Sequence, residues 1–250
     1  MRVTWLSQSE ADVPDVDHWL TARERARAAA MRYAKRRNDF LLGRWTAKRA
    51  VTRWLGLPGE VGALARVEIE NASDGSPRVL IGEEPAPVEI SMTDRAGWAV
   101  CVLRSRGAAI GCDLEIVEPR SPAFVADYFT PAEQATVRAG ATEADRHLRA
   151  NLLWSAKESA LKVLRTGLRR DTRSVEVSLG VCAEADAWHP LCVTAEEGIR
   201  FPGWWRRYGA FLLTVAAEVE MAPPASLDSP PAIASGVPTE SWRAGPLLRR

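Results

Sequence analysis

The sequence predicts a mixed α+β protein built from two similar halves. The order of helices followed by several strands occurs twice, and the pentapeptides Trp45–Arg49 and Trp154–Glu158, 109 residues apart, are nearly the same. Self-similarity of this kind indicates a duplicated unit. We therefore expect an N-terminal α+β half over residues 1–107, a C-terminal α+β half over 108–220 and a proline-rich tail without its own core over 221–250. A pseudo-twofold repeat would place a ligand site in the seam between the halves.

Helix signals come first in the N-terminal half. Helical periodicity predicts helices over about 19–37 and 40–55, and the second should end at Gly56 because Pro58 follows. Short runs of β-branched and aromatic residues, separated by turn clusters, then predict strands. These strands cover 66–70, 78–81, 88–92, 97–103 and 109–117.

The C-terminal half returns to helix at a capping box. Thr130, Pro131 and Glu133 predict a helix start, because the threonine and glutamate side chains satisfy each other's free backbone N–H groups. We assign Glu133 this structural role. A longer helix should follow over 143–165, before Gly167. Further strands are expected at 174–179, 191–194 and 208–219.

Composition and charge exclude several classes of protein. With 46% hydrophobic and 26% charged residues, the chain of 250 residues can bury a core, and no stretch is apolar for the length of a membrane span or a signal peptide. Four cysteines without a CxxC pair argue against a zinc ribbon, a thioredoxin-like motif and a disulfide framework. We therefore expect a cytoplasmic protein that does not bind membranes.

Basic residues are concentrated in one segment, although the net charge is only +1. Eleven Lys and Arg residues lie between Arg23 and Arg53, against two acidic ones. Such a cluster attracts an anionic ligand, or it is simply the solvated face of an arginine-rich helix. Nucleic acid is not the expected partner, because no aromatic-interleaved binding motif accompanies the basic run.

Two acidic residues share one face of a predicted strand. In the sequence Gly111-Cys-Asp113-Leu-Glu115, the alternation of side chains puts Asp113 and Glu115 on the same side. Two carboxylates ~7 Å apart repel each other unless water or a cation relieves them. Oxygen ligands without histidine point to Mg²⁺ rather than Zn²⁺. The alternative is a solvent-facing edge strand with two ordinary acids.

The predicted helix over 151–165 offers a third carboxylate. Glu158 and Lys162 lie opposite its apolar stripe, four residues apart. They form either a surface ion pair, or a site in which Glu158 joins the cation and Lys162 binds a phosphate. The apolar stripe consists of Leu153, Ala156, Ala160, Val163 and Leu164.

Four motifs in this order resemble the signature of the 4′-phosphopantetheinyl transferases of the surfactin-synthetase activator type. The family patterns G-[IV]-D-[IV]-E, F-[ST]-x-x-E and W-[ST]-x-K-E-[AS]-x-x-K are similar to Gly111–Glu115, Phe129–Glu133 and Trp154–Lys162, and Phe40–Arg44 resembles the N-terminal helix motif. The resemblance covers roughly residues 20–217. It implies two similar α+β halves with coenzyme A between them, and an enzyme that converts an apo carrier protein into its holo form.

The resemblance also implies roles for individual residues. Asp113, Glu115 and Glu158 would hold Mg²⁺ against the diphosphate of coenzyme A. Glu158, or a water beside it, would help to deprotonate the acceptor serine, and Lys162 would stabilise or protonate the departing 3′,5′-ADP. Glu158 and Lys162 are therefore the candidate catalytic residues of a holo-[carrier-protein] synthase.

The coenzyme contacts include positions that depart from the family pattern. The family usually has S-x-S-H-S where residues 91–95 read Ser-Met-Thr-Asp-Arg, and G-K-P or G-R-P where residues 75–77 read Gly-Ser-Pro. An aspartate repels a phosphate, so we expect neighbouring arginines to compensate and Asp94 to orient one of them. The expected coenzyme A contacts are Arg27, Arg44, Arg78, Thr93, Asp94, Arg95 and Lys162.

Two other functions are compatible with these residues. The departures at 91–95 leave open a carrier-protein-binding or coenzyme-A-binding paralogue without turnover. Asp113, Glu115 and Glu158 could alternatively serve a metal-dependent phosphodiesterase. For the transferase, the expected partner is an apo acyl or peptidyl carrier protein of fatty acid, polyketide or nonribosomal peptide synthesis.

Overall fold

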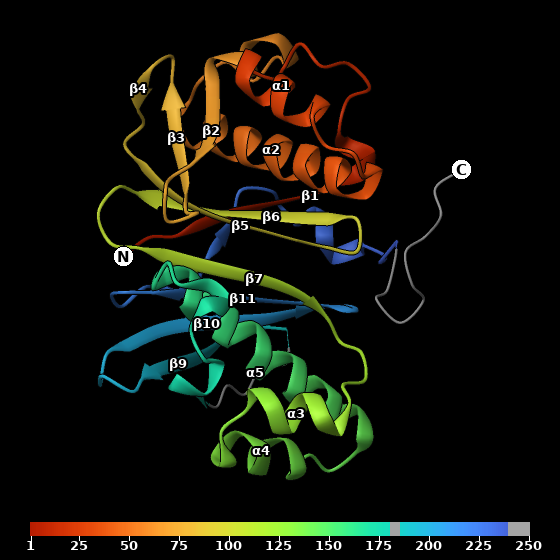
Figure 1. The fold of residues 1–250 in the computed structure, drawn as a ribbon, viewed down its shortest axis with the longest axis vertical. Coiled ribbons are helices and arrows are strands. Elements are labelled where there is room, and N and C mark those ends of the chain that lie inside the picture. Colours follow the sequence, from red (N-terminus) through yellow and green to blue (C-terminus); the bar gives the residue numbers. More distant parts are fainter. Residues whose placement is uncertain (181–185, 240–250) are drawn as a thin grey trace. The chain divides into compact units, whose positions relative to one another are not determined.

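The structure is a computed structural model that describes residues 1–180 and 186–239 (Figure 1). The chain divides into two compact units. The N-terminal unit contains Val3–Gly107 and the described residues from Ala225 onward, and the C-terminal unit contains Met1–Arg2 and Ala108–Pro224. Each unit combines helices with β-sheet, which confirms the predicted α+β class. No helix in the described ranges is long and apolar enough to cross a membrane.

A long helix packed on a sheet forms the centre of the N-terminal unit. Its elements are β1 (Thr4–Ser9), α1 (Ala22–Ala29), α2 (Ala34–Leu55), β2 (Val67–Asn71), β3 (Pro77–Ile81), β4 (Glu84–Pro85), β5 (Val88–Arg95), β6 (Trp98–Ser105) and β12 (Ala225–Ser226), with short 3₁₀ helices at Glu10–Asp12, Val61–Arg66 and Ala232–Ser235. One sheet has the strand order β12-β1-β6-β5, and β2-β3-β4 form another. Helix α2 lies across β1, β5 and β6 (Figure 1).

The C-terminal unit has the same kind of centre. Its elements are β7 (Ile110–Ile116), α3 (Pro122–Tyr128), α4 (Pro131–Arg138), α5 (Glu143–Val163), β8 (Val175–Leu179), β9 (His189–Ala195), β10 (Arg200–Tyr208) and β11 (Phe211–Ala217), with short 3₁₀ helices at Gly167–Arg169 and Thr172–Ser174. The antiparallel sheet has the order β7-β11-β10-β9-β8. Helix α5 packs across β7 and β11, and α4 packs on α5.

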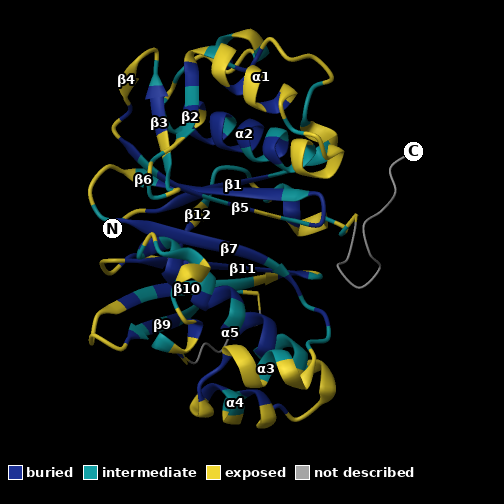
Figure 2. Cartoon of the chain, viewed as in Figure 1, coloured by how far each residue is buried: buried dark blue, intermediate teal, exposed yellow. Residues whose placement is uncertain are grey.

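Buried residues are concentrated in each long helix and in the sheet that it packs against (Figure 2). In α5, the predicted apolar stripe is confirmed, because Leu153, Ala156 and Ala160 are fully buried and Val163 is nearly so. They pack against strand residues such as Phe201 of β10. The hydrophobic contact between α5 and the sheet therefore fixes which side chains of α5 face β7.

Several element boundaries differ from the prediction. The predicted first helix is wrong: α1 ends at Ala29, and α2 begins at Ala34 after an extended Tyr33. No glycine or proline marks this break, and the packing of α1 on α2 overrides the helix propensity of the segment. The structure also adds β1, α3 and β10. Strand β10 contains Pro202 and Gly203, which are turn signals in a sequence.

Helix ends follow the signals in the sequence. The Thr130 hydroxyl accepts the N–H of Glu133, whose carboxylate accepts the N–H of Thr130, so the predicted capping box is confirmed. Thr142 and Asp145 form an equivalent box at the start of α5. Helix α2 ends at Gly56, which is left-handed with φ of 65°. These ends fix where the long helices begin and stop.

Each unit contains one buried lysine–glutamate pair. In the C-terminal unit, the fully buried Nζ of Lys157 lies 2.8 Å from a carboxylate oxygen of Glu133 and donates to the carbonyls of Thr172 and Val175. The other oxygen of Glu133 accepts the N–H of Val177. Burial lowers the pKa of Lys157 and raises that of Glu133, so both charges depend on this partner.

The N-terminal unit repeats this arrangement. The fully buried Lys48 contacts Glu24 and donates to the carbonyls of Trp19 and Leu64, while Glu24 accepts the N–H of Ile69. Burial lowers the pKa of Lys48. A capping box again ties the glutamate to a threonine. The threonine, glutamate and lysine are each 109 residues apart in the two units: Thr21 and Thr130, Glu24 and Glu133, Lys48 and Lys157.

The described part of the proline-rich segment belongs to the N-terminal unit. Strand β12 pairs in parallel with β1. Ile233 is fully buried, and its N–H donates to the Ser7 hydroxyl. The indole N–H of Trp98 donates to the carbonyl of Val237. Strand β12 therefore completes the sheet that residues 3–107 begin, and residues 227–239 pack on the same unit.

Candidate active site

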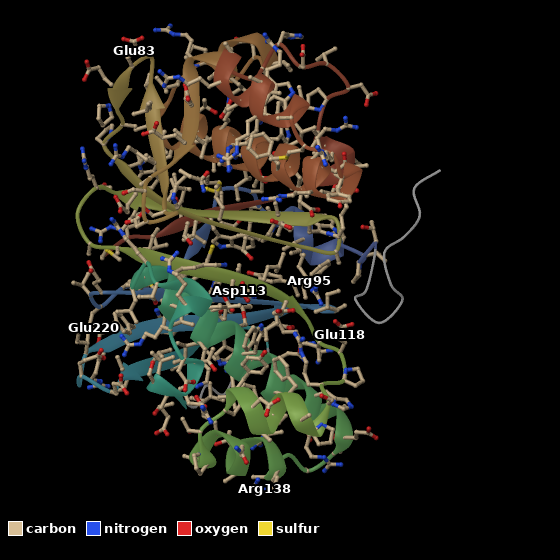
Figure 3. The ribbon with its side chains drawn as sticks, viewed as in Figure 1. Glu83, Arg95, Asp113, Glu118, Arg138 and Glu220 are labelled. Atoms are coloured by element: carbon tan, nitrogen blue, oxygen red, sulfur yellow. The ribbon has the colours of Figure 1, made fainter. Side chains whose placement is uncertain are left out.

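Strand β7 approaches α5 closely because residue 111 has no side chain. A Cβ at Gly111 would lie 2.0 Å from the carbonyl oxygen of Ser159 and 3.0 Å from the Cβ of Lys162. Side chains two and four residues further along the strand share this helix-facing side. Asp113 and Glu115 therefore lie on a common face, and it is the face toward α5. Asp113, labelled in Figure 3, is only 8% exposed and so does not face solvent, although β7 is an edge strand of its sheet, as the alternative expected.

Hydroxyl groups fix the register between α5 and the sheet. The Ser155 and Ser159 hydroxyls lie 2.8 and 2.7 Å from the hydroxyl of Thr214 in β11. Thr214 is the cross-strand neighbour of Asp113. Ser155 also donates to the Asp113 carbonyl at 3.3 Å. This buried network holds the helix turn before Glu158 against the middle of β7.

Replacing Gly111 by alanine should destabilise the C-terminal unit by about 1–3 kcal/mol, the usual cost of overpacking. The new methyl group would meet the backbone of α5, which cannot rotate away as a side chain can. Urea unfolding measures the loss. Gly43→Ala in α2 is the control, because a Cβ there meets nothing within 4 Å and alanine favours a helix. Equal stability of Gly111→Ala and the wild-type protein would contradict the close contact.

Lys162 bridges α5 and β7. Its Nζ donates to Asp113 Oδ1 at 3.0 Å and to the Cys112 carbonyl at 2.7 Å. Burial opposes its charge, but the carboxylates of Asp113 and Glu158 outweigh burial and raise the pKa of Lys162. The lysine is therefore a cation aimed at the carboxylates of the strand, not only the surface partner of Glu158.

Glu158 faces the two carboxylates of β7. Burial, followed by the negative charge of Asp113, raises the pKa of Glu158 to about 7; Lys162 lowers it, and Glu115 adds to the rise. The three acids are thus close enough to repel one another. Among the residues that the structure describes, however, no three His, Cys, Asp or Glu side chains gather in a metal-binding arrangement. The three predicted ligands lie near one another without forming a common coordination shell.

Both oxygens of Glu115 have protein contacts. Oε1 accepts the indole N–H of Trp154 at 3.0 Å, and Oε2 lies 3.0 Å from Nη2 of Arg120. Arg120 comes from the loop after β7, and no motif in the sequence pointed to it. A loop arginine five residues after a strand glutamate gives no periodic signal.

Two of the expected coenzyme contacts lie together in the N-terminal unit. Arg27 of α1 and Arg44 of α2 donate to the same Oδ1 of Asn71, at 3.2 and 2.7 Å, and both stack on Phe40. Burial, partly offset by Glu24, lowers the pKa of Arg44 to about 10. Asn71 was not a candidate residue in the sequence. It is the last residue of β2, directly before a turn, and in the sequence an asparagine at this place reads as an ordinary turn residue.

A basic cavity of about 360 Å³ adjoins Arg27. Arg32 and Arg36 line it, together with Tyr33, which is 74% exposed. The sequence did not single out these residues, although they fall within the basic segment between Arg23 and Arg53. The cavity gives that segment a concave, positively charged surface that suits an anion.

The remaining expected contacts lie on β3 and β5. Arg78 of β3 pairs with Glu70 of β2 at 3.5 Å. On β5, Thr93 is buried, Asp94 is exposed and Arg95 is partly buried. Glu70 precedes Asn71 in the chain, so Arg78 lies on the strand pair that carries the partner of Arg27 and Arg44.

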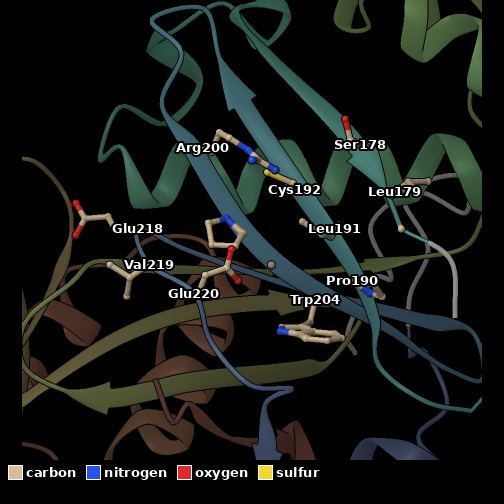
Figure 4. A pocket seen from close by; sticks show the side chains of 13 residues that line it. Ser178, Leu179, Pro190, Leu191, Cys192, Arg200, Trp204, Glu218, Val219 and Glu220 are labelled. Carbon is tan, nitrogen blue, oxygen red and sulfur yellow. The ribbon is translucent and has the colours of Figure 1, made fainter.

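A larger cavity, of about 510 Å³, lies on the other face of the C-terminal sheet (Figure 4). Trp205 pairs with Thr214, so the preceding residue, Trp204, points away from Asp113. Trp204 lines this cavity with Cys192 and Pro202, and its indole donates to the Met221 carbonyl. The cavity is therefore separate from the carboxylates.

Comparison with known proteins identifies the segment that carries these carboxylates. Residues 109–187 match the family model of the 4′-phosphopantetheinyl transferase superfamily. The match spans β7 to β8 and so includes Asp113, Glu115, Glu158 and Lys162. A search of curated proteins gave no match. The carboxylate-bearing segment of this chain is thus similar to the 4′-phosphopantetheinyl transferase superfamily.

Proposed function

We propose that this protein transfers the 4′-phosphopantetheine group of coenzyme A to a serine of an apo carrier protein, as a transferase of the surfactin-synthetase activator type. The observation that carries the proposal is the position of Asp113, Glu158 and Lys162 at the contact of β7 with α5, inside the segment that matches the superfamily. Two acids and a cation at one point suit chemistry on a diphosphate.

Asp113, Glu115 and Glu158 are the proposed ligands of Mg²⁺. Their oxygens are the donors that this ion prefers, and the mutual repulsion that raises the pKa of Glu158 is what a divalent cation would relieve. When bound, Mg²⁺ would neutralise charge on the diphosphate oxygens. Side chains of the protein would carry out the remaining steps, which are removal of the serine proton and stabilisation of the leaving group.

Glu158 is the proposed base and Lys162 the proposed partner of the leaving group. Glu158, or a water beside it, would accept the proton of the acceptor serine. The pKa of about 7 belongs to Glu158 in the cation-free protein, and a bound cation would lower it. The serine oxygen then forms a bond to the β-phosphorus of coenzyme A, while the bond from that phosphorus to the oxygen of 3′,5′-ADP breaks. Lys162, which stays protonated, stabilises the negative charge that develops on this oxygen.

Coenzyme A would use the N-terminal unit for its anionic nucleotide end. Arg27 and Arg44, with Arg32 and Arg36 in the adjoining cavity, supply the positive charge. We further propose that the two units are a pseudo-twofold repeat with coenzyme A held by residues of both. The equal spacing of the buried Thr–Glu–Lys sets in the two units supports the repeat.

A mass-spectrometric assay tests the function. The protein is incubated with coenzyme A, Mg²⁺ and several apo acyl and peptidyl carrier proteins, with a chelator control. We expect one carrier to gain the mass of one phosphopantetheine. Coenzyme binding without a mass gain would instead indicate a non-catalytic paralogue, and coenzyme cleavage without an acceptor would indicate a phosphodiesterase.

A further inference from the structure

We propose that Arg120 is a positioning residue for the cation site, because Arg120 and Trp154 together hold the carboxylate of Glu115 in the orientation that a ligand needs. The inference rests on the proposed function for the identity of the site. It concerns the side chains around Glu115. Of these, Trp154 begins one of the matched motifs, whereas Arg120, Phe124 and Asn151 belong to none of them.

Each oxygen of Glu115 has its own protein contact, a hydrogen bond at Oε1 and an ion pair at Oε2. The indole N–H of Trp154 donates to Oε1 and the Arg120 guanidinium contacts Oε2, both at 3.0 Å. The side chains of Arg120 and Glu115 are only 10% and 12% exposed, so water competes weakly for this pair. A carboxylate has about four lone-pair positions. Two contacts of this kind therefore fix the plane of the group and leave capacity for a further ligand.

Arg120 is itself held in place. Its Nε donates to Asn151 Oδ1 at 2.7 Å, and its guanidinium stacks on Phe124 at 4.8 Å from the ring centre. Asn151 is fully buried in α5, and its amide donates to the carbonyls of Glu118 and His147. The loop that follows β7 is thereby tied to α5, so the arginine reaches Glu115 from a fixed point.

The two side chains that contact Glu115, Arg120 and Trp154, pack against the same residue, Phe124. The ring of Trp154 lies 5.0 Å from that of Phe124 and 5.2 Å from that of Tyr128, both in edge-to-face contact. Phe124 thus packs against Trp154 and Arg120 at once. The close contact of α5 with β7 is made elsewhere, at Gly111 and Ser159. The Glu115 carboxylate is consequently surrounded by groups that orient it, and such contacts typically change metal affinity 10–100-fold.

The variants Arg120→Met and Arg120→Lys separate positioning from charge. If Arg120 acted only through its charge, Met would tighten cation binding and Lys would leave it unchanged. If it acts by orientation, both variants bind cation about 10–100-fold more weakly, because an ammonium group cannot replace the planar fork that reaches Asn151 and Glu115 together. Mn²⁺ titration of the full chain, followed by the loss of the free-ion paramagnetic resonance signal, measures the affinity.

Arg149→Lys is the matched control. Arg149 lies in α5 and, like Arg120, is an arginine tied to a neighbouring element: it donates to the backbone carbonyl of Thr136 and does not contact Glu115, so its replacement should leave Mn²⁺ affinity unchanged. Trp154→Phe tests the second donor, since the phenyl ring still packs on Phe124 while the N–H to Glu115 is lost. We expect several-fold weaker binding. This variant decides the question if Arg120→Met does not fold.

A second readout needs no cation. The indole N–H of Trp154 gives an NMR resonance that is assigned by its loss in Trp154→Phe. In Arg120→Lys this resonance should shift, and the proton should exchange faster with solvent, because Glu115 is no longer held against the indole. Asp113→Asn should leave that resonance in place. An unchanged resonance would overturn the inference.

The outcomes separate this inference from the proposed function. Wild-type Mn²⁺ affinity in Arg120→Lys and Trp154→Phe, in a protein that modifies carrier proteins, overturns the inference alone. Weaker binding in both variants, in a protein that modifies no carrier, overturns the function and leaves the positioning role. Absence of Mn²⁺ binding by the wild-type protein overturns the inference together with the cation site.

Discussion

Asp113→Asn and Glu158→Gln should each lower phosphopantetheine transfer by on the order of a thousandfold or more, with the fold intact. Each substitution keeps the size of the side chain and removes one negative charge from the proposed ligand set. Glu158→Gln also removes the proposed base. The rate is measured by the mass gain of the carrier protein over time at saturating coenzyme A and Mg²⁺.

Glu158→Gln should keep or gain stability. Burial and the charge of Asp113 disfavour the ionised form of Glu158, so neutralising Glu158 relieves repulsion in the cation-free protein. Asp113→Asn should lose stability, because it removes the carboxylate that Lys162 contacts at 3.0 Å. Urea unfolding without Mg²⁺ checks this. Glu143→Gln is the control, because Glu143 is an exposed acid at the start of the same helix. Transfer at the wild-type rate in Asp113→Asn would remove the basis for the cation site.

Lys157→Met should destabilise the protein by about 3–5 kcal/mol, because it leaves Glu133 as a buried acid without its cation. Glu133→Gln should be costly for the converse reason. The double variant should lose less than the sum, since no uncompensated charge remains. A double-mutant cycle by urea unfolding measures the coupling energy.

The N-terminal unit offers an internal comparison. Lys48→Met creates the equivalent defect at Glu24 and should give a loss of similar size. Hydrogen exchange would assign each loss to its unit, because a backbone N–H of β8 and one of β2 donate to Glu133 and Glu24, respectively. Losses that simply add in the double variant at 133 and 157 would mean that the ion pair carries little of the stability.

Local signals in the sequence were sufficient for several features of the fold and the site. The Thr130–Glu133 box, the stop at Gly56 and the common face of Asp113 and Glu115 depend on a few neighbouring residues, and each has the predicted form. Strand alternation could not say whether that common face met solvent or a helix. The face meets a helix because Gly111, which has no side chain, lets α5 pack closely against β7. This packing is a tertiary contact, which the local sequence does not show.

The features that were missed depend on distant partners. The charge of Lys157 suggests a surface residue, and only the approach of Glu133 from α4 makes its burial tolerable. Arg120 reaches Glu115 because Asn151 and Phe124 hold it, which no spacing along the chain reveals. The sequence nevertheless contains one sign of the buried pairs. The glutamate and the lysine of each pair are repeated 109 residues later in the other half.

The pairing of β12 with β1 and the burial of Ile233 have a consequence for synthesis on the ribosome. The strands of residues 3–107 emerge first, yet their sheet lacks its outer strand until residue 225 has left the ribosome, on the order of ten seconds later at ordinary elongation rates. All strands of the C-terminal sheet lie within residues 108–224, so this sheet can form as soon as these residues have left the ribosome. The unit begun first on the ribosome is therefore finished last, with the edge of β1 open to chaperones in the interval.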